Sequence, residues 1–372
     1  MAYSFDQDLI NAKIKEEYYS EYVSTTPLSG FMGGQPSDVI QTFDMKSGQG
    51  LSYRLSLKKD MDYENPIFDF DQAAGSEQQI TIFEDEIKLG KRRFANILDG
   101  EDLVKAATPL DIYGCLRPSL ISVNKRNLVK SIFDAACAPS TREKDPGLYN
   151  SAENGNGPRA DRVIYAGDGG AGDYKASIFE GVGDMGVATY EESGMSVAHI
   201  RKLKSLATNG GVNFEAEAKI MPYELRSRNG FAEERYVLFL NPNSYASLVS
   251  DPDWKNFMYR GTIQNNDQPE GLSGSRYRGM IEGVLIYECP ELIRYQVSSG
   301  VKNAAWNLFA GAQAFGLCFA QRPWFSIEHR DFGSIVAMAV TEIRGQKVIT
   351  FPSFQNPLVR VERGLIHSFT RV

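Results

Sequence analysis

The longest hydrophobic pattern with helical spacing lies in residues 109–139. Thr108 before Pro109 predicts the start of a helix, and Pro139 predicts its end. Pro118 lies inside the run and removes one backbone donor, so we expect a kink or a break within one turn of it. The apolar residues recur mostly at steps of three or four, on one stripe of the helix: Tyr113, Leu116, Leu120, Val123, Leu128, Ile132 and Ala136.

The pattern changes to a period of two between residues 47 and 95, which predicts a β ribbon. The apolar residues of the first strand are Leu51, Tyr53, Leu55 and Leu57, and those of the return strand are Ile80, Ile82, Ile87 and Leu89. The phase of the return strand changes between Phe83 and Glu86, which predicts a β-bulge there.

The long loop of the ribbon is acidic. Nine acidic residues and no basic ones lie between Asp60 and Glu86. This pattern is typical of a solvated, flexible loop, and it would equally suit an extended ribbon whose tip lies on a basic surface of another subunit.

Residues 1–46 show no sustained period, and their apolar residues are scattered and often aromatic. Such a segment cannot build a core alone, so we expect it to lie on another surface, of its own chain or of a neighbour.

A mixture of strands and helices is predicted after residue 140. Helices are expected to begin at Ser193 or Ser196, at Asn241-Pro242 and at Asp251-Pro252. A tight turn at Arg344-Gly345 is expected to join the last two strands of a hairpin. The predicted strands are residues 162–165, 236–240, 280–287, 335–340 and 346–351, with further strands at 358–361 and 366–372.

Composition narrows the class of protein. The chain has 372 residues and a formal net charge of −7, which argues against a protein built mainly to grip nucleic acid. It has no apolar run of the roughly 18 residues that a membrane helix needs, and its acidic start is unlike a signal peptide. We therefore expect a protein of the cytoplasm in which it is made. The four widely spaced cysteines are expected to be reduced and unpaired.

Candidate chemistry is sparse. Residues 167–172 match G-x-G-x-x-G, but the residues after them are a poor helix start, so a surface loop is the better interpretation. The three histidines have no metal-ligand spacing, and His199 is expected to be a surface or packing residue. Glu328, His329 and Arg330 are expected to form a charged strand edge. The sequence thus predicts no catalytic, cofactor-binding or metal-binding residues.

The order of these parts resembles the fold of tailed-bacteriophage major capsid proteins, the Johnson fold. The strongest local resemblance is Tyr-Val-Leu-Phe-Leu-Asn-Pro at residues 236–242, followed by Asp-Pro-Asp-Trp at 251–254. These pieces resemble the podovirus major capsid family of coliphages that package a giant virion RNA polymerase. Other pieces with matching order and spacing are residues 48–55, 162–167, 273–274, 277–279, 284–287, 311–314, 324–325 and 331–333.

The resemblance implies an α+β fold with five parts. These would be an N-terminal arm (1–46), an extended β-hairpin loop (47–100), a peripheral-domain spine helix (101–150), an axial α/β domain with parts of the peripheral domain (151–330), and peripheral closing strands with a C-terminal tail (331–372). The arm and the ribbon would lie on neighbouring subunits. The closing strands at 335–351 would pack beside the spine helix.

The resemblance also implies the function and the partners. The protein would assemble with itself into hexamers and pentamers of an icosahedral head, in the virion. It would meet portal and scaffolding or decoration proteins, and would contact packaged double-stranded DNA non-specifically. No cofactor, membrane or enzymatic activity would be involved.

Candidate intersubunit residues follow from combining charge with this resemblance. The basic residues of the spine helix would meet the acidic ribbon tip of a neighbour, or would face DNA, and we favour the first. The candidates are Lys58, Lys59, Asp60, Asp62, Glu64, Asp69, Asp71, Lys125, Arg126 and Lys130.

Two alternatives remain open from the sequence. One is another oligomeric virion part, such as a neck or tail component. The other is an enzyme with a small-molecule site in the α/β region, which would need the glycine cluster near Asp168 to face a pocket.

Overall fold

A computed structural model gives the fold of the chain. It describes residues 19, 21–45, 50–58, 82–99, 112–136, 162–166, 194–210, 219–226, 232–259, 276–292, 294–296, 303–330, 335–352 and 360–371. The predicted glycine motif at 167–172 and most of the acidic loop at 60–86 lie outside these residues.

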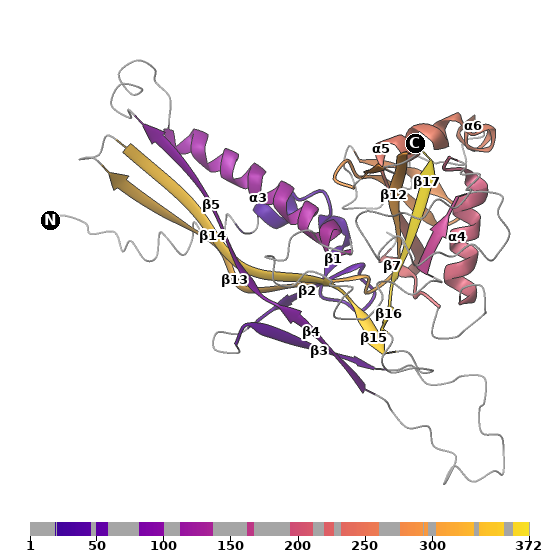
Figure 1. Ribbon diagram of the computed structural model, residues 1–372, viewed down its shortest axis with the longest axis horizontal. Coiled ribbons are helices and arrows are strands. Elements are labelled where there is room, and N and C mark those ends of the chain that lie inside the picture. Colours follow the sequence, from indigo (N-terminus) through magenta and orange to yellow (C-terminus); the bar gives the residue numbers. More distant parts are fainter. Residues whose placement is uncertain are drawn as a thin grey trace, which may run out of the picture.

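One half of the molecule is a five-stranded sheet with a long helix on one face (Figure 1). The helix is α3 (Ile112–Ala136), and it packs on β14 and β5. The strand order is β1 (Met32–Gly33), β2 (Ile40–Asp44), β13 (Phe315–Arg330), β14 (Ile335–Val348) and β5 (Gly90–Asp99). The position of β14 beside α3 is the one that the resemblance implied for the closing strands.

The other half is an eight-stranded sheet with α4 (Val197–Asn209), α5 (Pro242–Ser250) and α6 (Pro252–Tyr259). The strand order is β6 (Val163–Tyr165), β17 (Leu365–Arg371), β12 (Asn303–Ala310), β8 (Ala232–Leu240), β10 (Val284–Glu288) and β9 (Tyr277–Ile281), with β11 (Arg294–Gln296) on β12 and β7 (Tyr223–Arg226) on β8. Strand β8 is apolar throughout its second half because it is buried on both faces. Val237 and Phe239 face one core, whereas Tyr236, Leu238 and Leu240 face the core beneath α4 to α6.

Two smaller strand pairs complete the structure. The ribbon is β3 (Ser52–Lys58) with β4 (Ile82–Lys88), and the second pair is β15 (Thr350–Pro352) with β16 (Arg360–Glu362). A short 3-10 helix, η1 (Ser29–Phe31), lies near the junction of the two halves.

The predicted break at Pro118 is wrong. Helix α3 runs without interruption from Ile112 to Ala136 with Pro118 inside it. Pro118 is exposed and lies in the second turn, so the carbonyl that loses its partner can turn to water. The buried stripe that follows holds the helix on the sheet: Leu120, Ile121, Leu128, Val129, Ile132, Phe133 and Ala136. Val123, predicted to lie in this stripe, is 40% exposed.

Replacing Pro118 should therefore stabilise the protein. We expect Pro118→Ala to raise the free energy of unfolding by about 1–3 kcal/mol, because it restores one backbone hydrogen bond and removes a ring clash. The denaturant midpoint of the unassembled subunit measures this, and Ser122→Ala at a nearby exposed position controls for helix propensity. A Pro118→Ala midpoint at or below that of the wild type would contradict the prediction.

The predicted bulge at residues 83–86 is also wrong. Strands β3 and β4 pair in one continuous antiparallel register from Ser52–Lys88 to Lys58–Ile82. The inward-facing residues of β4 are Phe83, Asp85 and Ile87. Because the buried Asp85 is acidic, the alternation of apolar and polar residues looks interrupted in the sequence, although the strand is regular. The alternation does change phase, but at Leu89 and Gly90, where the chain passes from the ribbon into β5.

Two other strand predictions needed correction. Residues 280–287 form the hairpin of β9 and β10, because Glu282 and Gly283 take positive φ values of 48° and 83°, as a two-residue I′ turn requires. Arg344 and Gly345 form no turn, since both lie inside β14. Gly345 is instead needed where β4 crosses the sheet, because a Cβ there would overlap the carbonyl oxygen of Lys88.

Three of the helix starts predicted from cap residues are confirmed, whereas the start predicted at Thr108 and Pro109 lies outside the described residues. Ser196 caps α4 by accepting from the backbone N–H of His199, and Asn241 caps α5 by accepting from that of Asn243. Asp251 caps two helices, since its carboxylate accepts from the backbone N–H of Val197 at 2.7 Å and of Asp253 at 3.0 Å.

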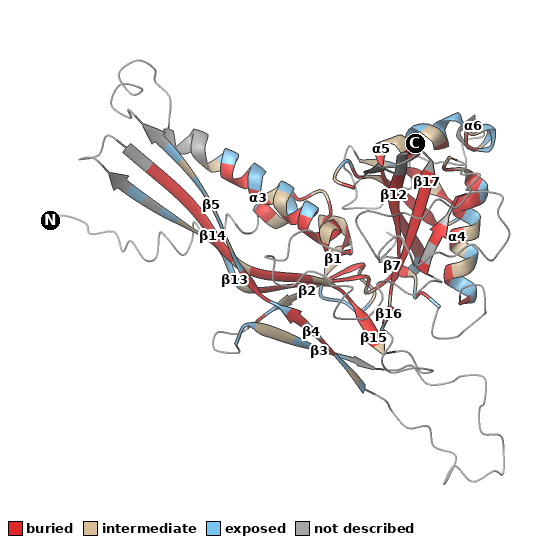
Figure 2. Cartoon of the chain, viewed as in Figure 1, coloured by how far each residue is buried: buried red, intermediate tan, exposed pale blue. Residues whose placement is uncertain are grey.

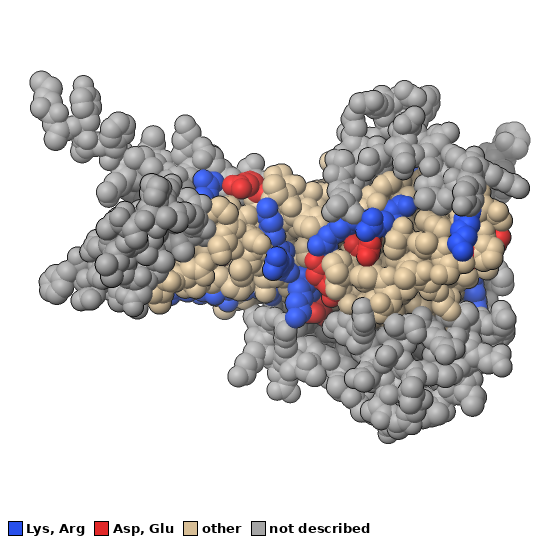
Figure 3. Space-filling view, turned by 90° about the horizontal axis from the view of Figure 1, so that it is seen from above, with Lys and Arg blue, Asp and Glu red and all other residues tan. Residues whose placement is uncertain are grey.

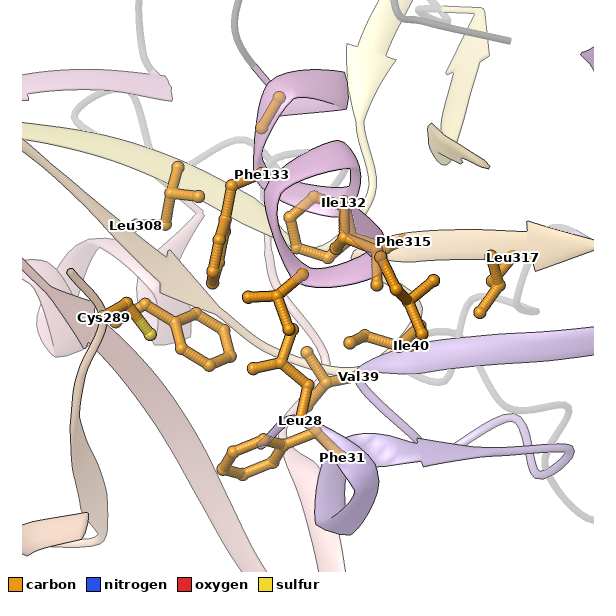
Figure 4. Packing of buried hydrophobic residues seen from close by; sticks show 14 of the residues in the cluster. Leu28, Phe31, Val39, Ile40, Ile132, Phe133, Cys289, Leu308, Phe315 and Leu317 are labelled. Atoms are coloured by element: carbon orange, nitrogen blue, oxygen red, sulfur yellow. The ribbon is translucent and has the colours of Figure 1, made fainter. Parts of the chain in front are cut away.

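Residues 21–45, which we call the bridging segment, pack between the two halves (Figures 2 and 4). Phe31 makes edge contacts with Phe239 and Tyr287, at ring-centroid distances of 5.5 and 5.4 Å. Leu28 and Val39 are fully buried in the same core, which also holds Ile132 and Phe133 of α3. The resemblance implied an arm on a neighbouring subunit for residues 1–46, but residues 21–45 pack within their own chain, because their scattered aromatic residues each fill a place between the two sheets.

Candidate assembly surfaces

The exposed face of α3 is basic. Arg126 and Lys130 are exposed and one turn apart, and Lys125 beside them is half-buried. Seen from above in Figure 3, Lys and Arg side chains form a broken row that crosses both halves of the molecule, with Asp and Glu between them. Of the three spine-helix residues predicted from the sequence, Arg126 and Lys130 thus share one exposed side of α3, whereas the half-buried Lys125 lies farther round the helix.

The ribbon presents an acidic outer face. Glu84 and Glu86 are exposed on β4, opposite Ser56 and Arg54 of β3. Arg54 Nη1 lies 3.9 Å from Glu84 Oε2, in an exposed ion pair. Among the predicted contact residues, Lys58 ends β3. The others in the ribbon lie outside the described residues: Lys59, Asp60, Asp62, Glu64, Asp69 and Asp71.

A second basic surface was missed by the sequence analysis. Along β5, the side chains of Arg92 and Asn96 point to α3, where they bond to Asn127 and Ser119. The alternate residues are exposed on the opposite face: Lys91, Arg93, Ala95 and Ile97. Ile97 is 62% exposed, so this face combines two cations with an uncovered apolar side chain. The alternation of residues along β5 indicates in the sequence that every second side chain is exposed. Which set is exposed depends on the change of phase at Leu89 and Gly90.

The interior chemistry is structural. His199 is buried, as the packing alternative predicted, and its Nε2 lies 2.8 Å from Ser368 Oγ. The fully buried His367 lies with Nε2 3.0 Å from Glu362 Oε1 and accepts from Trp306 Nε1–H at Nδ1, at 3.3 Å. These contacts join β17 to α4 on one face and to β12 and β16 on the other.

Burial, together with a smaller effect of nearby Lys202, lowers the pKa of His199 to about 4. As the pH falls below 6.5, His199 takes up a proton in the unfolded chain but stays neutral in the folded chain. The folded state is therefore most stable, with respect to this residue, above pH 6.5, and it loses stability as the pH falls toward 4. The free energy of unfolding of the wild type should therefore fall between pH 7 and pH 4.5. In His199→Gln, which lacks this titrating group, we expect the decrease to be smaller by about 2–3 kcal/mol. Urea unfolding at both pH values measures this, and equal losses would contradict it.

Cys289 and Cys318 are buried thiols. Burial raises the pKa of the Cys318 thiol to about 12 and that of Cys289 well above its usual value. Both are free, in agreement with the prediction for these two residues. The described residues contain no cluster of His, Cys, Asp and Glu that could hold a metal ion. No helix within the described ranges has the length and hydrophobicity to cross a membrane.

Comparison with known proteins decides the family. The sequence matches the phage capsid protein family over residues 6–355. The chain belongs to this family. It is 23% identical over 335 residues to the major capsid protein of Pseudomonas phage KPP25, covering 87% of this chain and 85% of that protein.

Solved capsid structures share its fold. The capsid of Ralstonia phage GP4 superposes with a TM-score of 0.68 at 20% identity, over 92% of this chain and 90% of that one. The capsid of Helicobacter pylori bacteriophage KHP30 gives 0.65 at 12% identity, over 93% and 91%. The Cyanophage Pam1 capsid gives 0.63 at 16% identity, over 94% and 93%. The fold is therefore the α+β phage major capsid (Johnson) fold, as the resemblance implied, and the protein is a structural component of a phage head.

Proposed function

We propose that this capsid protein forms the hexamers and pentamers of an icosahedral shell that encloses double-stranded DNA. The observation that supports this most strongly is the family match, which spans most of the chain and includes strands of both sheets. It favours a shell subunit over a neck or tail component, and over an enzyme. We further propose that the protein has no catalytic role, is made in the host cytoplasm, and meets portal and scaffolding or decoration proteins.

We assign the peripheral domain to the five-stranded sheet with α3, and the axial domain to the eight-stranded sheet with α4 to α6. The division follows the two sheets. Strand β17, which lies near the C-terminus of the chain, belongs to the eight-stranded sheet and therefore to the axial domain. The narrower resemblance, to coliphages that package a virion RNA polymerase, stays a prediction.

Contacts between subunits would be heterologous, as ring closure requires. The acidic ribbon and the basic surface of α3 lie on the same chain. The carboxylates on the ribbon of one copy can therefore contact the basic side chains on α3 of the next copy. In this proposal Lys125, Arg126 and Lys130 meet the acidic residues Asp60, Asp62, Glu64, Asp69 and Asp71 of a neighbour. Lys58 and Lys59 flank this acidic block and would contact the neighbour as well.

Reversing the three charges tests this contact. We expect Lys125→Glu, Arg126→Glu and Lys130→Glu together to abolish shell assembly, because acids would then face acids. The subunit should stay folded, since Arg126 and Lys130 are exposed and Lys125 is only half-buried. Light scattering over a concentration series measures assembly, and circular dichroism checks the fold.

A matched variant separates the contact from the change in net charge. Lys202→Glu, Lys219→Glu and Lys255→Glu make the same charge change on the other half of the molecule, and we expect shells to form. Normal shells from the α3 variant, or equal loss in both variants, would contradict the proposed contact.

A further inference from the structure

The described part of the ribbon rests on the subunit body by its inner face. On its inner face Leu55 and Ile87 are buried in a small core with Cys318, Ile349 and Phe351. Leu55 pairs across the ribbon with Asp85, which is 3% exposed. Farther along β4, the inward-facing Phe83 is half-buried and packs against the same core. Asp85 therefore lies between Ile87 and Phe83 on the inner face, where the ribbon rests on the body.

Asp85 is a carboxylate in a row of apolar side chains. Its Oδ1 accepts from Lys347 Nζ at 2.6 Å, and its Oδ2 accepts from the backbone N–H of Thr350 at 3.1 Å and from the Thr350 hydroxyl at 3.4 Å. Lys347 lies in β14 and Thr350 in β15, so one side chain joins the ribbon to two strands of the body.

These bonds fix the orientation of the ribbon, which the small apolar core does not. Apolar burial is non-directional, so it holds the ribbon against the body without fixing its angle. Hydrogen bonds have preferred distances and angles, and those to a charged group are the stronger ones. Three donors from the body, beside the backbone N–H of Glu86 in the ribbon itself, bond to one buried carboxylate and therefore fix the direction in which β3 and β4 leave the body.

We propose that Asp85 is a positioning residue for assembly, which sets the angle at which the ribbon reaches a neighbouring subunit. The inference rests on the proposed function, in which the ribbon contacts the next copy. The outer end of the described part of β4, at Ile82, lies three residues from Asp85, about 10 Å at the rise of an extended strand. A rotation of the ribbon at Asp85 would therefore move that end relative to the neighbouring subunit.

Asp85→Asn tests the proposal with little change of shape. The amide can still accept from Thr350, but it places an NH₂ group or a neutral oxygen opposite the Lys347 ammonium. In the unassembled subunit we expect the amides of β4 to exchange hydrogen at least about tenfold faster, whereas those of β12 and β17 exchange as in the wild type. In assembly we expect open or irregular aggregates in place of closed shells. Glu84→Gln, at the exposed neighbouring position of the same strand, should change neither measurement.

The outcomes separate the two proposals. Unchanged exchange in Asp85→Asn, or faster exchange with normal closed shells, would overturn the role of Asp85. If Asp85→Asn does not fold, Lys347→Met removes the ammonium while leaving the Thr350 bonds, and normal exchange and shells from it would also overturn that role. If the wild type itself forms no shells, the proposed function fails, whereas the exchange comparison still decides whether Asp85 fixes the ribbon.

Discussion

Replacing Phe31 with alanine should cost about 3–5 kcal/mol of unfolding free energy, the usual range for removing a fully buried phenylalanine. The Phe31 ring is 1% exposed and touches Phe239, Tyr287 and Tyr223 of the eight-stranded sheet, while its own segment continues into β2 of the five-stranded sheet. The cavity would therefore open between the two halves. Chemical denaturation of the unassembled subunit measures the loss.

The control is Leu51→Ala, which removes an apolar side chain that is 75% exposed, and should change stability by no more than about 0.5 kcal/mol. We also expect both sheets to unfold in one transition, because a single core contains residues of both sheets and of the bridging segment. A loss below about 1 kcal/mol for Phe31→Ala, or separate unfolding of the two sheets in the wild type, would show that the segment does not join them.

Removing the Arg344 charge should cost a similar amount, about 3–5 kcal/mol, because it leaves the Glu342 carboxylate buried without its cation. Both side chains lie beneath α3, with 0% and 1% of their side-chain surface exposed, and Nε of Arg344 lies 2.6 Å from Oε1 of Glu342. Arg344 also donates to Asn127 of α3 at 2.6 Å, so the pair ties the helix to β14. We expect Arg344→Met to show this loss in the denaturant midpoint.

Removing both charges should be milder than removing one. Arg344→Met with Glu342→Gln leaves no buried ion, so most of the lost stability should return. Arg54→Met provides an exposed comparison, since its ion pair with Glu84 is 77% and 67% exposed and should contribute no more than about 1 kcal/mol. If the double variant is less stable than Arg344→Met, the uncompensated charge is not the cause of the loss.

Local signals made part of the fold predictable. Ser196, Asn241 and Asp251 cap helices through bonds to residues two or three positions away, so short sequence patterns were sufficient. Pro118 and Gly345 misled the prediction because their effects depend on packing. The sheet beneath α3 holds a helix that contains a proline, and β4 crosses β14 at Gly345.

The candidate surfaces were predictable to a similar extent. Helical spacing was enough to place Arg126 and Lys130 on the outer face of α3. The exposure of Lys91 and Arg93 depends on a change of phase where the ribbon enters the sheet. The burial of Asp85 depends on partners more than 260 positions away in the chain, which no local pattern could indicate.

Electron cryomicroscopy of the purified protein, over a range of concentrations, tests the central claim most directly. The account predicts closed icosahedral shells built of six-subunit and five-subunit rings, each subunit showing the two halves joined by the bridging segment. Tubes, single rings or unassembled subunits at every concentration would contradict it.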